Sequence, residues 1–204
     1  MLHRYSFNDG TAGDSCATAG SALAGTIVGS ATVSGGVLNV PSQGPYVSLP
    51  AGTFGSYTSI SIELWATPGS SLGGWARIFQ LGSSVSNTGS LVLDRNSNTG
   101  KVYMEYFPAS TSIPVTTTVD FNGQYLHVAI VLAVGAKPIL YVNGVSQGVA
   151  EYTMTAMLTP NYFRVGGSLD GGNSFQGTIN EFRIWAGALS AAAIASHYQQ
   201  GPGE

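Results

Sequence analysis

Short apolar segments recur along the whole chain, and clusters of glycine, serine, asparagine and proline separate them. Within most segments apolar and polar residues alternate, which is typical of strands that bury one face and expose the other. Many short strands with turn residues between them indicate an all-β sandwich. The expected strands cover residues 2–7, 37–40, 46–49, 59–66, 77–81, 91–94, 102–106, 125–134, 139–142, 145–149, 162–165 and 177–185.

One run of residues departs from this pattern and predicts a helix near the C-terminus. Ser190 is a good N-cap, and the alanine-rich run 191–195 that follows it favours a helix. We expect this helix to reach Tyr198 and to end before Gly201, since glycine is common just beyond a helix C-terminus.

The length of the chain bounds its organisation. A chain of 204 residues suits one all-β domain, and no linker or internal repeat divides it. We therefore assign residues 1–200 to a single sandwich domain and residues 201–204 to a polar tail. Because an expected strand begins at residue 2, the chain has the form of a domain cut from a longer protein.

Charge is scarce in this sequence, and its scarcity restricts the possible partners. Charged residues make up 8% of the chain, against about 25% in an ordinary soluble domain. With seven lysines and arginines and a net charge of −3, no basic stripe exists that could bind nucleic acid. No apolar run is long enough for membrane insertion. Low charge with abundant glycine, serine, threonine and alanine favours an extracellular protein, either secreted or on a cell surface.

Five longer segments carry a family resemblance and together span most of the chain. They read LHRYSFNDGTAGDS at 2–15, SISIELWATP at 59–68, QYLHVAIVL at 124–132, ILYVNGV at 139–145 and FQGTINEFRIWAGALSAAAIASHY at 175–198. In this order they resemble laminin G-like domains of the concanavalin A-like lectin/glucanase superfamily, and the last segment is the most specific. The resemblance implies a two-sheet antiparallel jelly roll, with one concave and one convex sheet and a short C-terminal helix.

The superfamily contains both binding modules and enzymes, so catalysis is a separate question. Its glucanases carry paired carboxylates on one strand, because hydrolysis needs an acid and a nucleophile close together. Here Glu63 and Glu105 each stand alone on their strands, and His3, His127 and His197 lack the setting of a lyase. We therefore expect no enzymatic activity. A glycan hydrolase or lyase is the alternative if Glu63 and Glu105 face each other.

Calcium is the cofactor that the resemblance implies, as one structural ion held by several oxygen ligands. Asn180 stands where related proteins usually have aspartate, which weakens the expected site. In each loop the alternative is a turn stabilised by a side-chain oxygen, without an ion. The first expected site combines Asn8, Asp9 and Asp14 with Asn180, and a second combines Asp170 with Asp94.

Sugar binding requires flat aromatic faces with polar groups beside them. Trp75 is the best candidate because glycines flank it on one side, whereas Trp65 and Trp185 match family strands and are expected in the core. A core position is the alternative for Trp75 as well. The predicted ligand-binding residues are Trp75, Arg77, Tyr106 and Asp170, with Phe107 and Tyr162 at the same end.

These observations favour a non-catalytic carbohydrate-binding or adhesive module of an extracellular protein. Its partner would be a carbohydrate or a glycosylated surface, as for a lectin or a cell-adhesion domain. The alternative is a structural subunit of a surface layer, filament or capsid that associates with copies of itself, which the low charge fits almost as well.

Overall fold

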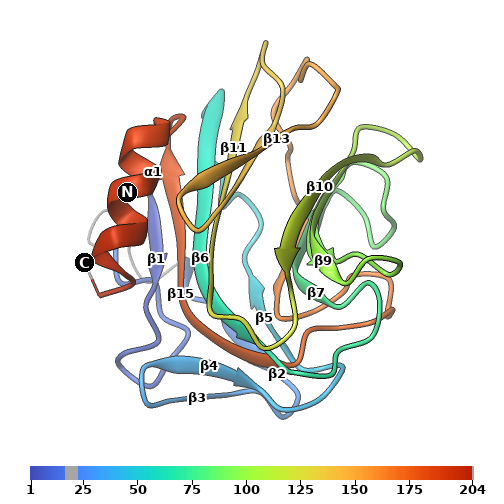
Figure 1. Cartoon of the computed structure of the whole chain (residues 1–204). Helices are drawn as coiled ribbons and strands as arrows, with labels where there is room; N and C mark the ends of the chain where they lie inside the picture. The colour runs from blue at the N-terminus through green and yellow to red at the C-terminus, as the bar shows by residue number, and fades with distance from the viewer. Residues whose placement is uncertain (17–22, 204) are drawn as a thin grey trace.

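The computed structural model describes residues 1–16 and 23–203, so the last residue of the predicted tail lies outside the described part. Two antiparallel sheets pack face to face, as Figure 1 shows. Sheet A contains β1 (His3–Tyr5), β3 (Thr32–Ser34), β4 (Val37–Val40), β6 (Ser59–Pro68), β11 (Leu126–Ala133), β12 (Ile139–Val142), β13 (Val145–Val149) and β15 (Gly177–Ala186). Sheet B contains β2 (Thr26–Val28), β5 (Tyr46–Leu49), β7 (Arg77–Gly82), β8 (Ser90–Arg95), β9 (Lys101–Phe107), β10 (Ile113–Asp120) and β14 (Tyr162–Val165).

The order of strands differs from their order in the sequence, as in a jelly roll. Sheet A runs β13-β12-β11-β6-β15-β4-β3, with β1 paired to β15, and sheet B runs β10-β9-β8-β7-β14-β5-β2. The predicted fold class, a two-sheet antiparallel sandwich with a C-terminal helix, is confirmed.

The predicted strands are all present, with small shifts at their ends, but three further strands were not predicted. These three, β2, β3 and β10, each lie at an edge of a sheet. They carry many exposed or half-buried residues, because an edge strand has only one neighbour and is less covered. The alternation that identifies a strand in the sequence is therefore weak in all three.

The core lies between the sheets and takes alternate residues from each strand. Ile62 and Leu64 of β6 meet Leu91 and Leu93 of β8 in one apolar cluster. Burial nevertheless extends to the other face of both strands, where Glu63 and the residues alternating with Leu91 and Leu93 are fully covered. The outer faces of both sheets are therefore partly buried too, and they carry buried charged groups such as Glu63 on β6 and Asp94 on β8.

The helix α1 (Ala191–Gln200) covers the outer face of sheet A, as seen in Figure 1. Ser190 caps it by accepting a hydrogen bond from the backbone N–H of Ala193, and Ile194 packs on Val131 and Tyr141 of the sheet. The predicted helix is confirmed, and it ends two residues beyond Tyr198. Among the described residues, no helix is long and apolar enough to cross a membrane.

Candidate functional site

The outer face of sheet B carries a pocket of about 250 Å³, lined by Trp75, Arg77, Asn87, Glu105 and Phe107. Strand alternation places these side chains there. On β9, Met104 and Tyr106 point into the core, so Glu105 and Phe107 point outward. A bulge between Arg77 and Phe79 of β7 interrupts the pairing with β8, which turns Arg77 outward at the start of its strand.

Trp75 stands at the mouth of the pocket and is held firmly. Its side chain is 36% exposed, and its ring lies 5.8 Å from the ring of Tyr103. Its backbone has a φ of 61° and donates a hydrogen bond to the carbonyl of Arg95 at 2.8 Å. The amide of Asn173 also donates to the carbonyl of Gly74 at 2.6 Å. Trp75 is therefore an exposed aromatic face on a rigid support.

Arg77 is almost buried and is fixed by the loop that follows β14. Its Nη1 donates to a carboxylate oxygen of Asp170 and to the hydroxyl of Ser168. The backbone N–H of Gly172 donates to the same carboxylate at 2.9 Å. Burial by itself raises the pKa of Asp170, but the hydrogen bonds from Arg77 and Ser168 lower it far below its ordinary value. Asp170 is therefore ionised and holds the guanidinium in place.

Asp94 lies beneath this pocket without a partner. The strand register places it between Arg77 on β7 and Tyr103 on β9. Its side chain is 0% exposed, yet no described residue hydrogen bonds to either carboxyl oxygen, and the Nε of Arg77 is equally unpartnered. Burial raises the pKa of Asp94 well above its ordinary value, and the charge of Glu105 raises it further, although Arg77 lowers it. Buried polar groups without partners are rare and point to function.

Glu105 is the second carboxyl group of the pocket. It accepts a hydrogen bond from the hydroxyl of Ser112 at 2.7 Å. Burial raises its pKa above the ordinary value, although Ser112 and Arg77 act in the opposite direction. Burial and the charges of Glu105 and Asp94 also raise the pKa of Tyr103 to about 12, so the phenol keeps its proton. The floor of the pocket thus combines charged and neutral hydrogen-bonding groups.

Of the four predicted ligand-binding residues, the structure brings Trp75, Arg77 and Asp170 together. Tyr106 instead points into the core, where its ring lies 5.5 Å from that of Tyr152. Phe107, the next residue on β9, lines the pocket.

Sequence reasoning missed two residues of this region. Tyr103 shares the outward face of β9 with Glu105, so the alternation of the strand could have identified it. Asn87 lies in the loop between β7 and β8 and reaches the site by accepting a hydrogen bond from Gln80 at 2.9 Å. No sequence pattern indicates that contact.

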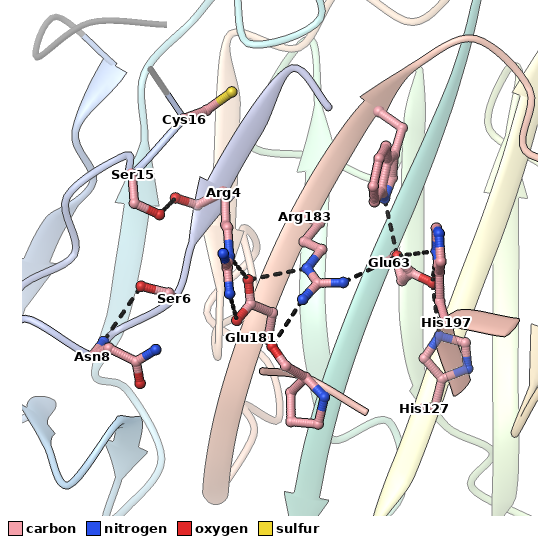
Figure 2. A network of polar contacts seen from close by, with 12 residues as sticks. Arg4, Ser6, Asn8, Ser15, Cys16, Glu63, His127, Glu181, Arg183 and His197 are labelled. Atoms are coloured by element: carbon pink, nitrogen blue, oxygen red, sulfur yellow. Dashed lines mark hydrogen bonds and ion pairs between the residues drawn. The ribbon is translucent and has the colours of Figure 1, made fainter. Parts of the chain in front are cut away.

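A second polar cluster lies on the outer face of sheet A, under α1 (Figure 2). One oxygen of Glu63 accepts from Nε2 of His127 at 2.9 Å and from Nδ1 of His197 at 3.1 Å. The other oxygen accepts from the indole N–H of Trp185 at 3.0 Å. Figure 2 shows Arg183 between this group and Glu181. The cluster ties the helix to the sheet and leaves Glu63 fully buried.

The enzymatic alternative requires Glu63 and Glu105 to face each other, and the structure gives the position of both residues. Glu63 lies on the outer face of sheet A, whereas Glu105 lies on the outer face of sheet B. The apolar core separates them, since the neighbours Leu64 and Met104 both pack inside it. Glu63 and Glu105 therefore do not face each other.

Asp14 and Asp9, the two acidic residues of the first predicted calcium site, already accept hydrogen bonds from other groups. Asp14 accepts hydrogen bonds from His3 at 2.8 Å and from the backbone N–H groups of Arg4 and Cys16 at 3.0 Å. Asp9 accepts from the N–H and hydroxyl of Thr11 in a local turn.

The other members of the predicted calcium sites lack a matching arrangement. At the first site, Asn180 is half-buried on β15, and the backbone N–H of Asn8 donates to the hydroxyl of Ser6. At the second site, the guanidinium of Arg77 lies between Asp94 and Asp170. Within the described part of the chain, no group of three or more acidic, histidine or cysteine side chains could hold a metal ion. These contacts do not favour an ion in either loop, and calcium binding stays a prediction.

Comparison with known proteins identifies the family. Residues 41–195 match the sequence model of the concanavalin A-like lectin/glucanases superfamily, in its laminin G form. The chain therefore belongs to this superfamily, and the predicted family is confirmed; the match spans the segments at 59–68, 124–132 and 139–145 and most of the closing segment, whereas the segment at 2–15 lies outside it. No curated protein sequence matches the chain.

Solved structures show the same fold at low sequence identity. Domain 4 of AbnA, a GH43 extracellular arabinanase from Geobacillus stearothermophilus, matches with a TM-score of 0.78 and 21% identity over 96% of each chain. The binding domain of botulinum neurotoxin serotype G matches with a TM-score of 0.70 and 14% identity, over 98% of this chain and 50% of that one. Trypanosoma rangeli sialidase matches with a TM-score of 0.71 and 16% identity, over 99% of this chain and 33% of that one.

Proposed function

We propose that this domain is a non-catalytic carbohydrate-binding module of an extracellular protein, and that its glycan binds in the pocket on sheet B. One observation carries the proposal: a firmly held, exposed tryptophan stands directly beside buried polar groups, among which both carboxyl oxygens of Asp94 and the Nε of Arg77 lack hydrogen-bond partners. Protein sites for sugars combine a flat apolar surface with a few fixed polar groups.

In the proposed complex, each side chain that lines the pocket contacts the sugar in a different way. Trp75 and Phe107 offer apolar faces to the C–H groups of a sugar ring. Arg77 and Asn87 donate hydrogen bonds to its oxygens, and Glu105 accepts from its hydroxyl groups. Since Arg77 is already fixed by Asp170, little side-chain freedom is lost on binding, which favours affinity.

Two proteins of the same fold support a sugar ligand. Domain 4 of AbnA was solved in complex with arabinotriose. A structure of botulinum neurotoxin type C matches with a TM-score of 0.72 and 14% identity, over 98% of this chain and 50% of that one, and the cell entry of this toxin depends on interaction with two ganglioside molecules. The arabinanase is extracellular, which agrees with the location that we propose for this domain.

The test is a glycan panel measured by thermal unfolding and calorimetry, with a variant that removes only the aromatic face. Trp75→Asn suits this purpose, because asparagine tolerates the positive φ of 61° at this position. A ligand that binds only the folded state raises Tm as its concentration rises. We expect at least one glycan to do so, and Trp75→Asn to weaken its binding by about tenfold or more.

The matched control is Tyr125→Ala, which removes an aromatic side chain that is 54% exposed, next to β11 of sheet A. It should leave the affinity unchanged. Equal affinities for the wild type and Trp75→Asn would contradict the proposal. The absence of any glycan response, together with concentration-dependent self-association, would favour the structural subunit instead.

A further inference from the structure

We propose that the pocket on sheet B selects neutral glycans and rejects anionic ones, and that Glu105 determines this specificity. The inference rests on the proposed function and adds the chemical class of its ligand. The inference follows from the charges around the pocket, from the ion pair that Arg77 already forms with Asp170, and from the hydrogen-bonding capacity of the polar groups in the pocket.

The pocket on sheet B has more acidic groups around it than basic ones. Arg77 is the only cation among the lining residues, whereas Glu105 lines the pocket, Asp94 lies beneath it and Asp170 lies beside it. Even with Asp94 protonated, one positive charge faces two negative ones. A carboxylate or sulfate group entering this space meets a net negative charge in a partly buried setting, where water screens poorly.

Arg77 does not offer an anion an open site. Its Nη1 is engaged by Asp170 and by the hydroxyl of Ser168, so its charge is already balanced by a neighbouring carboxylate. An anionic ligand would therefore compete with Asp170, which the backbone N–H of Gly172 also holds. A hydroxyl group needs no such exchange, because it accepts one hydrogen bond from a fixed donor.

Arg95, Lys101 and Arg164 also lie on strands of sheet B, and none of them lines the pocket; Arg95 donates a hydrogen bond to the carbonyl of Asn96 at 3.3 Å. Lys101 forms an ion pair with Asp120 at 2.8 Å. Arg164 lies 4.3 Å from the centre of the Tyr46 ring and donates to the carbonyl of Ser168 at 2.6 Å. The field inside the pocket is therefore set by the acidic groups.

The hydrogen-bonding capacity of the pocket also favours a neutral glycan. Glu105 lines the pocket, and among the described side chains its carboxylate accepts a hydrogen bond only from the hydroxyl of Ser112. Sugar hydroxyl groups donate as well as accept, so they can satisfy such oxygens, whereas the carboxylate of a uronic or sialic acid only accepts. A neutral, hydroxyl-rich glycan thus suits both the charge and the hydrogen-bonding capacity of the pocket.

The experiment compares a matched pair of ligands by calorimetry. One is the neutral glycan that binds best in the panel, and the other is the same glycan with its primary alcohols oxidised to carboxylates. We expect the wild type to bind the neutral form at least about tenfold more tightly. We also expect the residual binding of the anionic form to strengthen as salt rises from about 20 to about 200 mM, because salt screens repulsion.

Glu105→Gln tests the assignment, since it removes one charge and retains the shape of the side chain. It should raise the affinity for the anionic form, relative to the neutral form, by about tenfold. Glu151→Gln, which removes an exposed carboxylate paired with Lys137, is the control for net charge and should change neither affinity. Circular dichroism checks that both variants are folded.

The outcomes separate this inference from the proposed function. Binding of the anionic form as tightly as the neutral one, through Trp75, would overturn the inference and leave the proposed function standing. An unchanged preference in Glu105→Gln, or binding of the anionic form that weakens with salt, would overturn it too. If no glycan of either kind binds, both proposals fail.

Discussion

Asp94 is the residue whose surroundings are least favourable to folding. A carboxyl group that is fully buried and unpartnered costs stability when it is ionised, which explains why burial and Glu105 raise its pKa. Proteins commonly retain such groups where function requires them. At this scale the buried Asp94 is a local loss of stability beneath the candidate site.

The substitution Asp94→Asn should stabilise the protein, and increasingly so as pH rises. The folded-state pKa lies above the unfolded-state value, so the cost of burying Asp94 is full above the folded-state pKa, decreases as pH falls below it and is absent below the unfolded-state pKa. We expect the Tm of the variant to exceed that of the wild type by about 2–4 °C for each ~1 kcal/mol relieved. Thermal unfolding of both proteins between about pH 5 and pH 9 measures the difference. A difference that does not change with pH would contradict this account of Asp94.

At the scale of elements, the contact between β15 and β6 depends on one glycine. Gly177 has a φ of 146°, and a Cβ atom built there would lie 2.2 Å from the carbonyl oxygen of Thr67. Only a residue without a side chain allows the two strands to approach this closely. This contact joins the middle of sheet A and thereby supports the strands that carry the polar cluster under α1.

Replacement of Gly177 by alanine should therefore lower the free energy of unfolding by about 2 kcal/mol or more. Gly73→Ala is the matched control, because a Cβ atom there meets nothing within 4 Å. Urea unfolding of the two variants gives the comparison. Similar stabilities would show that the sheet adjusts and that the close approach is not required.

Glu63 connects the helix to sheet A. Burial by itself raises the pKa of Glu63, but hydrogen bonds and charges from His127 and His197 lower it below its ordinary value of 4.5. Its contribution to stability is therefore present above the unfolded-state pKa and is lost as pH falls through the folded-state pKa. The carboxylate serves the packing of α1, far from the pocket on sheet B.

Glu63→Gln should lower the free energy of unfolding by about 3 kcal/mol at pH 7, because donors from both histidines and Trp185 then face an amide. The difference from the wild type should shrink at acidic pH, below the ordinary glutamate pKa of 4.5 and through the lower folded-state pKa, where the wild-type carboxylate protonates. Denaturant unfolding at both pH values tests this, and unchanged glycan binding by the folded variant is expected. Loss of binding with the fold intact would instead place Glu63 in the site.

For the whole molecule, the sequence predicts the sandwich better than the site. Alternation and the closing segment identify the strands and α1, because these signals are local. The pocket depends on which residues meet across strands, and the bulge between Arg77 and Phe79 changes that register. A sequence contains no direct record of such a bulge, so the grouping of Asp94 with Arg77 could not be predicted. On β9 the expected residues Tyr106 and Phe107 point to opposite faces, and only Phe107 lines the pocket.

The central claim for the whole molecule is that its glycan binds on sheet B, at Trp75. The most direct test is an NMR titration that follows the indole N–H signals of the tryptophans, assigned through Trp75→Asn. Trp65 is buried and the indole of Trp185 donates to Glu63 under α1, so both should keep their signals while that of Trp75 shifts with glycan concentration. A shift of the Trp185 signal, or a bound glycan that leaves the Trp75 signal unmoved, would contradict the account.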